Sequence, residues 1–164
     1  KQIFLSASSD PIMEKINFNK PRVIEYPVFA DDRGVFAPFL NGLEEIAPKS
    51  AGIKRIYYVC NDSKGVVRGF HYHKKEWKFF VIVFGSAKFV ALNPDKPDEK
   101  YQFISSARKN NLIIIPPLYA NGWVSLSDNT ILVCGSSSTT EESIKDDKRF
   151  EPYKWGDVWS VKSR

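Results

Sequence analysis

The sequence predicts an all-β fold: an antiparallel β-sandwich or barrel with few short helices. Short runs of β-branched and aromatic residues recur along the chain at near-regular spacing, separated by turn-forming residues, a pattern typical of such folds. Aromatic residues make up 14% of the chain, and they favour strands. Helical periodicity is weak, with its best candidates near residues 42–47 and 141–147.

Several segments carry the strand pattern, and each ends at a turn signal. Residues 77–94 are long enough for a hairpin with Gly85-Ser86 at its centre, because glycine suits the first position of a tight type II′ turn. The tail, residues 150–164, is rich in aromatic side chains and is expected to pack back onto the domain. The predicted strand segments are 22–30, 53–60, 66–73, 77–94, 101–106, 111–117, 121–127 and 130–138.

A chain of 164 residues is expected to form one domain. We assign this domain to residues 22–164 and residues 1–21 to an N-terminal arm. No apolar run approaches the roughly 18–20 residues that span a membrane, and the first ten residues are too polar for a signal peptide. Cys60 and Cys134 lie inside apolar runs, where free buried thiols are usual. A cytoplasmic protein without a membrane partner is therefore expected.

The charge balance points to an anionic ligand. The formal net charge is +5 and the isoelectric point is about 9.1. The lysines are scattered, and no long block of lysine and arginine is present. This distribution favours a small phosphorylated ligand over nucleic acid as the partner.

Both histidines of the chain, His71 and His73, lie in one short segment. Side chains alternate faces along a strand, so the two imidazoles are expected to share one face with Val67 and Gly69, pointing into the sandwich. A glycine beside them would let a ligand approach the backbone. We therefore place a functional site at this strand.

A metal site and a proton-transfer site are the two chemical alternatives for these histidines. The segment GVVRGFHYHKKE, residues 65–76, resembles the first motif of the cupin superfamily, whose His-x-His and Glu residues bind a divalent ion. No histidine follows His73, and Glu76 falls one residue earlier than that motif prefers. This set is poor for a transition metal, so neither a metal nor another cofactor is expected. An imidazole is a good general base near neutral pH.

The segments DDRG, GVVRGFHYH, IPP, ANGWVSLSD and KWGDVW occur in the order seen in the dTDP-4-dehydrorhamnose 3,5-epimerase family, which this chain resembles over most of residues 22–160. That resemblance implies a cupin-type jelly roll, a homodimer without metal, and a nucleoside-diphosphate 4-keto sugar as substrate. It implies that His71 is the base that removes a proton next to the ketone. Asp157 would orient His71, and Lys78 would stabilise the enolate oxygen. The product would serve surface polysaccharide (lipopolysaccharide or capsule) biosynthesis.

The same resemblance implies where the nucleotide binds. Arg68 resembles the arginine that grips the diphosphate, since guanidinium groups bind phosphate in a bidentate manner. Arg33 resembles a second phosphate ligand that reaches in from a neighbouring subunit. Asn121 stands where the family has a second histidine, and residues 131–139 lack the family's tyrosine acid. Pro38 replaces a carboxylate that helps to hold thymine, so the nucleotide and the inverted carbon stay open.

A second resemblance is to the dTDP-4-keto-6-deoxyglucose 3,4-ketoisomerase family, also a metal-free cupin. Its pattern places two histidines in the site and a tyrosine on the preceding strand, which here is Tyr57 or Tyr58. On this basis His73 and Tyr58 join the predicted substrate-binding residues, and Asn121 joins them from its place in the epimerase pattern. Epimerase activity is the first hypothesis, ketoisomerase activity the second, and a non-catalytic cupin that binds sugar nucleotides the third.

Overall fold

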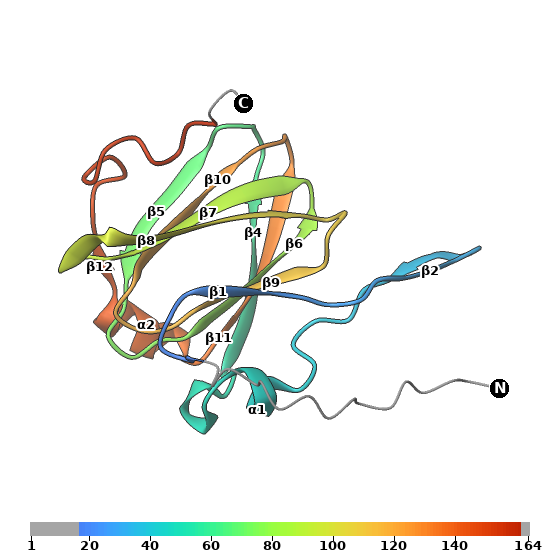
Figure 1. Cartoon of the computed structure of the whole chain (residues 1–164), viewed down its shortest axis with the longest axis horizontal. Helices are drawn as coiled ribbons and strands as arrows, with labels where there is room; N and C mark the ends of the chain where they lie inside the picture. Colours follow the sequence, from blue (N-terminus) through green and yellow to red (C-terminus); the bar gives the residue numbers. More distant parts are fainter. Residues whose placement is uncertain (1–16, 162–164) are drawn as a thin grey trace.

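The computed structural model describes residues 17–161. Within this range the strands form two five-stranded antiparallel sheets and one separate hairpin (Figure 1). The first sheet has the order β1 (Arg22–Glu25), β9 (Asn111–Ile115), β6 (Lys78–Phe84), β11 (Thr130–Ser136), β4 (Arg55–Asn61). The second has the order β12 (Lys148–Arg149), β5 (Val67–Tyr72), β10 (Ala120–Ser125), β7 (Ser86–Asn93), β8 (Lys96–Ser106). The remaining elements are β2 (Phe29–Asp31), β3 (Gly34–Phe36), helices α1 (Leu43–Ile46) and α2 (Thr140–Asp146), and a 3₁₀ turn, Lys49–Ala51.

The main core lies between the two sheets. Phe80 and Ile113 from the first sheet pack in one buried cluster with Phe89 and Trp123 from the second. The Phe80 and Phe89 ring centroids are 5.5 Å apart. An antiparallel β-sandwich with few short helices was predicted, and the structure confirms it. The hairpin predicted over residues 77–94 is wrong: β6 and β7 flank Gly85 but belong to different sheets, β6 pairing with β9 and β11 and β7 with β8 and β10. The turn at Gly85, whose φ of 76° favours glycine, instead carries the chain from one sheet to the other.

The aromatic tail covers the outer face of the second sheet, as predicted. Phe70 of β5 is buried there against Trp155 and Trp159, with ring centroids 5.0 and 4.9 Å away. Phe150 pairs with Phe70 through two backbone hydrogen bonds of 3.0 and 3.1 Å. The tail is therefore joined to the edge of the sheet as well as packed upon it.

A register shift interrupts the alternation of β5 before the histidines. His71 lies opposite Asn121, but Arg68 lies opposite Trp123, so two residues of β5 face one residue of β10. Trp123 belongs to the main core, which places Arg68 on the inner face. Val67 packs instead in the outer cluster. The prediction that Val67 shares the face of His71 is therefore wrong, because a bulge reverses the alternation between them.

The segment predicted as one strand over residues 22–30 forms two short strands. Pro27 stands between β1 and β2, and proline has no N–H to donate to a ladder. From β2 the chain turns at Arg33 and returns as β3, making an arm that projects from the body of the sandwich (Figure 1). Val35 and Phe36 on this arm are about two-thirds exposed.

Most of the expected N-terminal arm, residues 1–16, lies outside the described residues. Of the described part of the arm, Phe18 packs against a core cluster.

Within residues 17–161, none of the helices has the length and apolarity needed to cross a lipid bilayer.

The close contact at the bulge gives a stability prediction. A Cβ at Gly122 would lie 2.6 Å from the carbonyl oxygen of Arg68 and 2.8 Å from the Cα of Gly69. Gly122→Ala should therefore lower the free energy of unfolding by about 1–3 kcal/mol, the usual cost of overpacking. Denaturant unfolding measures this loss.

Gly52→Ala is the matched control. The φ of Gly52 is −52°, and the nearest atom to an added Cβ is 3.7 Å away. The substitution should therefore change the free energy of unfolding by no more than about 0.5 kcal/mol. Equal stability of the two variants would contradict a tight approach of β5 and β10.

Candidate functional site

An open pocket of about 310 Å³ lies at the end of the sandwich where His71 and His73 point inward. Strand β4 contributes Tyr57, and the start of β6 contributes Lys78. The remaining wall comes from α2 and from the residues that follow it, including Asp147. The pocket therefore combines both sheets with a helix that lies far from the histidines in the sequence.

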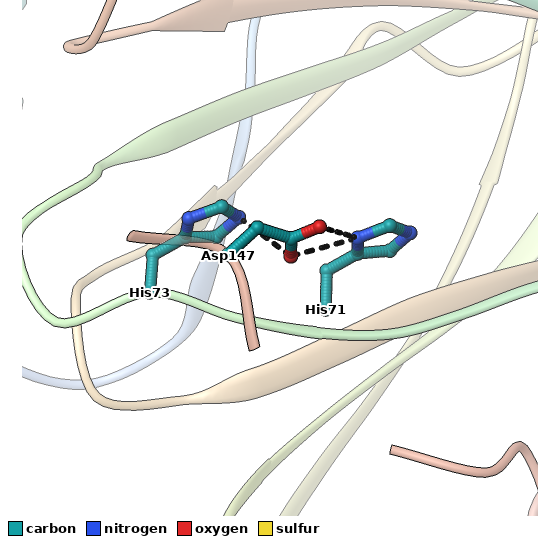
Figure 2. A group of neighbouring side chains, drawn as sticks. All are labelled: His71, His73 and Asp147. Carbon is teal, nitrogen blue, oxygen red and sulfur yellow. Dashed lines mark hydrogen bonds and ion pairs between the residues drawn. The ribbon is translucent and has the colours of Figure 1, made fainter. Parts of the chain in front are cut away.

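His71 and Asp147 form a hydrogen-bonded pair in this pocket (Figure 2). His71 Nδ1 lies 3.1 Å from Asp147 Oδ1 and 3.4 Å from Oδ2. Burial and the nearby Lys78 lower the pKa of His71, while Asp147 acts in the opposite direction. A neutral ring that donates its Nδ1 proton to the carboxylate keeps a free lone pair on Nε2, the atom that can accept a proton from a substrate.

Asp147 is placed by the elements on either side of it. Helix α2 begins with a capping box between Thr139 and Glu142, and Asp147 follows its last residue. Strand β12 then pairs with β5, with Arg149 opposite His71. Arg149 Nε also donates to Asp147 Oδ2 at 2.9 Å. Burial acts to raise the pKa of Asp147, but the hydrogen bonds from Arg149 and His71 lower it below its ordinary value.

Asp157 does not pair with His71, contrary to the role predicted for it. Its Oδ1 accepts from the backbone N–H groups of Trp159 and Ser160 at 3.0 and 3.1 Å. The WGDV segment lies in the tail, on the outer face of the second sheet, whereas His71 points to the inner face. The capping box and the acidic residues after it were visible in the sequence, but no spacing relates Asp147 to His71.

His73 and Lys78 form the second pair in the pocket. Lys78 Nζ lies 3.0 Å from His73 Nε2, and both side chains are buried. Burial and then Lys78 lower the pKa of His73 to about 4. His73 is therefore neutral at physiological pH, and Lys78 presents a cation in the pocket.

The donor set in the pocket does not fit a divalent metal ion, although the donor atoms of His71, His73 and Asp147 lie within 4.8 Å of one another. The Lys78 ammonium lies 3.0 Å from His73 Nε2, where a metal would have to bind. Arg149 already occupies one oxygen of Asp147. Two cations at the donor atoms would repel a third.

The predicted tyrosine is corrected from Tyr58 to Tyr57. Alternation along β4 leaves Tyr58 74% exposed on the outer side, whereas Tyr57 lines the pocket. Burial, followed by Cys134, raises the pKa of Tyr57. The guanidinium of Arg55 lies over the Tyr57 ring, 4.9 Å from its centroid.

The other predicted binding residues lie outside the pocket in this chain. Asn121 is buried, and its Nδ2 donates to the carbonyl of His71 at 3.1 Å. Arg68 Nε donates to Asn61 Oδ1 at 2.6 Å, and Arg68 Nη2 to the Cys60 carbonyl at 3.3 Å. Arg33 is on the projecting arm, where it pairs with its neighbour Asp31. The structure thus brings together His71, His73 and Lys78 with Tyr57, the alternative to Tyr58, and adds Asp147, which was not predicted.

The His71–Asp147 pair gives a spectroscopic prediction. Asp147→Asn should lower the pKa of His71 further, because the carboxylate that favours the imidazolium is lost. Proton NMR titration of the ring measures the shift, and the chain has only two histidines to resolve. Asp157→Asn is the control and should leave the His71 titration unchanged. A shift in Asp157→Asn without one in Asp147→Asn would contradict the pairing.

Several solved structures that are similar to this chain are described as epimerases or ketoisomerases, with TDP, dTDP or a TDP sugar bound. The chain is similar to dTDP-4-dehydrorhamnose 3,5-epimerase from Bacillus anthracis str. Ames, solved with TDP and PPi bound (TM-score 0.75, 22% identity, covering 92% of this chain and 90% of that chain). It is similar to a double mutant of ChmJ, a 3′-monoepimerase from Streptomyces bikiniensis, in complex with dTDP (TM-score 0.76, 18% identity, 90% and 78% covered).

A third similar structure is a mutant of the 3,4-ketoisomerase QdtA from Thermoanaerobacterium thermosaccharolyticum in complex with TDP-4-keto-6-deoxyglucose (TM-score 0.65, 23% identity, 81% and 88% covered). These likenesses confirm the predicted cupin-type fold. A search among curated proteins returned no match. A family model described as "FdtA: WxcM-like, C-terminal" matches residues 19–155. Because this match covers most of its length, the chain belongs to the FdtA, WxcM-like C-terminal family.

Proposed function

We propose that the protein is an isomerase that removes a proton from the carbon next to the ketone of a nucleoside-diphosphate 4-keto sugar. The observation that carries this proposal is the His71–Asp147 pair beside Lys78 in one pocket. The similar structures support the substrate class, since they bind TDP, dTDP or TDP-4-keto-6-deoxyglucose. The basic balance of the chain suits a diphosphate.

The chemistry follows from the three side chains. His71 Nε2 takes the proton from the carbon, and the electrons of the broken C–H bond move to the ketone oxygen to form an enolate. Asp147 stabilises the resulting imidazolium through Nδ1. Lys78 donates to the enolate oxygen, which is electrostatic stabilisation in a partly buried site. No metal is needed for this step.

The composition of the pocket favours ketone migration, as in a 3,4-ketoisomerase. Inversion of a centre needs an acid on the face opposite the base, and burial of Tyr57 raises its pKa, which makes this tyrosine a weak proton donor. Ketone migration instead passes protons along one face through an enediol. His71 Nε2 can return the proton to the neighbouring carbon on the same face, so this route needs no acid on the opposite face.

Epimerisation is the second candidate. The epimerase structures match with TM-scores of 0.75 and 0.76, against 0.65 for the ketoisomerase. Tyr57 comes from the sheet opposite the one that carries His71, the side from which a proton must be donated to invert the carbon.

We further propose that the protein acts in the cytoplasm, because its two free cysteines suit a reducing compartment. Surface polysaccharide synthesis would use the product of either reaction.

The first test of this proposal is NMR in deuterium oxide with nucleoside-diphosphate 4-keto-6-deoxy sugars. Wild-type protein should introduce deuterium next to the ketone, and the product should show either a moved ketone or an inverted centre. His71→Asn should abolish the exchange, and Lys78→Ala should slow it by about 10²–10³-fold, the scale of one oxyanion partner. Nucleotide binding, measured by calorimetry, is the control and should persist in both variants. Undiminished exchange in His71→Asn would exclude His71 as the base.

The protein is further proposed to act as a homodimer in which the arm completes the partner's site. Arg33 lies in the turn between β2 and β3, at the tip of the arm. The arm projects away from the body of the sandwich (Figure 1), and Phe29, Val35 and Phe36 on it leave apolar surface exposed. A second copy that covers this surface would bring a guanidinium to the diphosphate. The resemblance to the epimerase family supports this arrangement.

Subunit mixing tests the arm. Arg33→Ala and His71→Asn should each be inactive alone, but hybrids made by mixing them should recover part of the activity, because one pocket then has both residues intact. A mixture of His71→Asn with Lys78→Ala is the control, since every hybrid pocket remains defective. Absence of recovery in the first mixture, with hybrids confirmed by native mass spectrometry, would contradict action across subunits.

A further inference from the structure

Glu76 is a fully buried carboxylate that none of the steps above uses. It lies between β5 and β6, and its side chain has 0% exposure. Its Oε1 accepts from Ser136 Oγ at 2.7 Å and from Arg55 Nη2 at 3.2 Å. Its Oε2 accepts from Ser143 Oγ at 2.6 Å. A buried carboxylate is costly unless it is paired and hydrogen-bonded, and these donors compensate for its burial.

The ring of His73 lies between this carboxylate and Lys78. An ammonium group has only donors, so the 3.0 Å contact with Lys78 Nζ requires Nε2 of His73 to be the acceptor. The single proton of the neutral ring is then on Nδ1. That nitrogen is buried and has no hydrogen-bond partner, although Glu76 Oε2 lies 3.1 Å from it.

We propose that Glu76 is a positioning residue, whose carboxylate holds the proton of His73 on Nδ1 so that Nε2 accepts from Lys78 and aims the ammonium into the pocket. This inference deepens the proposed function, since Lys78 is the group that would meet the enolate oxygen. It also gives His73 a role as the support of Lys78.

The same carboxylate anchors the other half of the site. Ser143 is on α2, and Asp147 follows the end of that helix. The 2.6 Å hydrogen bond from Ser143 to Glu76 therefore fixes the helix that carries the partner of His71. One buried group thus supports both pairs, His71 with Asp147 and His73 with Lys78.

Asp147 offers the competing arrangement. Its Oδ1 lies 3.6 Å from His73 Nε2, so a proton on Nε2 could point to Asp147 instead. That arrangement would place the Nε2 proton against the Lys78 ammonium and leave Nδ1 as a bare acceptor facing a carboxylate. Both contacts would be repulsive. The Nδ1–H form of His73 removes both repulsions.

Imidazole ¹⁵N NMR of the free wild-type protein tests this inference without any substrate. His73 should show a protonated Nδ1 and an unprotonated Nε2 at neutral pH. The chain has only two histidines, and the signals that remain in His71→Asn are those of His73. A proton on Nε2 of His73 in the wild-type protein would overturn the proposal. Because this readout needs no activity, failure here is distinct from failure of the proposed reaction.

Glu76→Gln is the decisive variant. Ser136 and Arg55 keep the amide oxygen at the Oε1 position, so the NH₂ group replaces Oε2 and donates towards His73 Nδ1. The ring should then switch its proton to Nε2, and kcat should fall about 10–100-fold with little change in KM, as for other supporting partners of a reactive group. Retention of the Nδ1 proton in folded Glu76→Gln would contradict the proposal.

Ser143→Ala is the matched control, because it removes a hydrogen bond from the same oxygen but leaves the charge. It should keep the proton of His73 on Nδ1. A switch to Nε2 in this variant would overturn the assignment to the carboxylate. If circular dichroism shows that Glu76→Gln does not fold, the ¹⁵N spectra of the wild-type protein and of Ser143→Ala still show which nitrogen of His73 carries the proton.

Discussion

The pairing of the short strand β12 with β5 is the interaction on which the candidate site depends. It places Arg149 opposite His71 and brings Asp147 within hydrogen-bond distance of the imidazole. Two residues of β12 alone would hold such a register weakly. The ladder continues through the two backbone bonds between Phe150 and Phe70, and burial of the tail's tryptophans on Phe70 stabilises it. Apolar packing on the outer face thus holds a polar pair on the inner face.

The bulge between β5 and β10 is the second constraint. Gly69 and Gly122 allow the two backbones to approach so closely that an added Cβ at either would lie 2.8 Å from the other's Cα. The extra residue places Arg68 on the inner face together with His71, although simple alternation separates them. A bulge that redirects a side chain beside a site is a recurrent use of this irregularity. In β5, the bulge places the side chains of His71 and Arg68 on the same face of the sheet.

Most of the fold could be predicted from the sequence, because strand patterns and turn residues are local signals. His71 and His73 could be predicted for the same reason, and Lys78 joined them through the resemblance to the epimerase family. Asp147 could not, since its position depends on the register of β12 against β5, which no local pattern encodes. Of the two candidate tyrosines, Tyr58 was chosen as the binding residue and Tyr57 lines the pocket, because a shift of one residue changes the face of the sheet. The interruption at Pro27 was visible, but a projecting arm depends on contacts that the sequence alone does not show.

The site keeps both imidazoles neutral, and this has a cost at low pH. The pKa of His71 is lowered and that of His73 falls to about 4, chiefly through burial. As pH falls below about 6.5, the two imidazoles bind protons in the unfolded chain but not yet in the folded chain. The free energy of unfolding therefore declines until the pH reaches the pKa of each imidazole in the folded chain. The lowered pKa of Asp147 adds a loss of stability in more acidic solution, below its ordinary value of 3.8. His71 is consequently unprotonated at neutral pH, the state that the proposed proton abstraction requires.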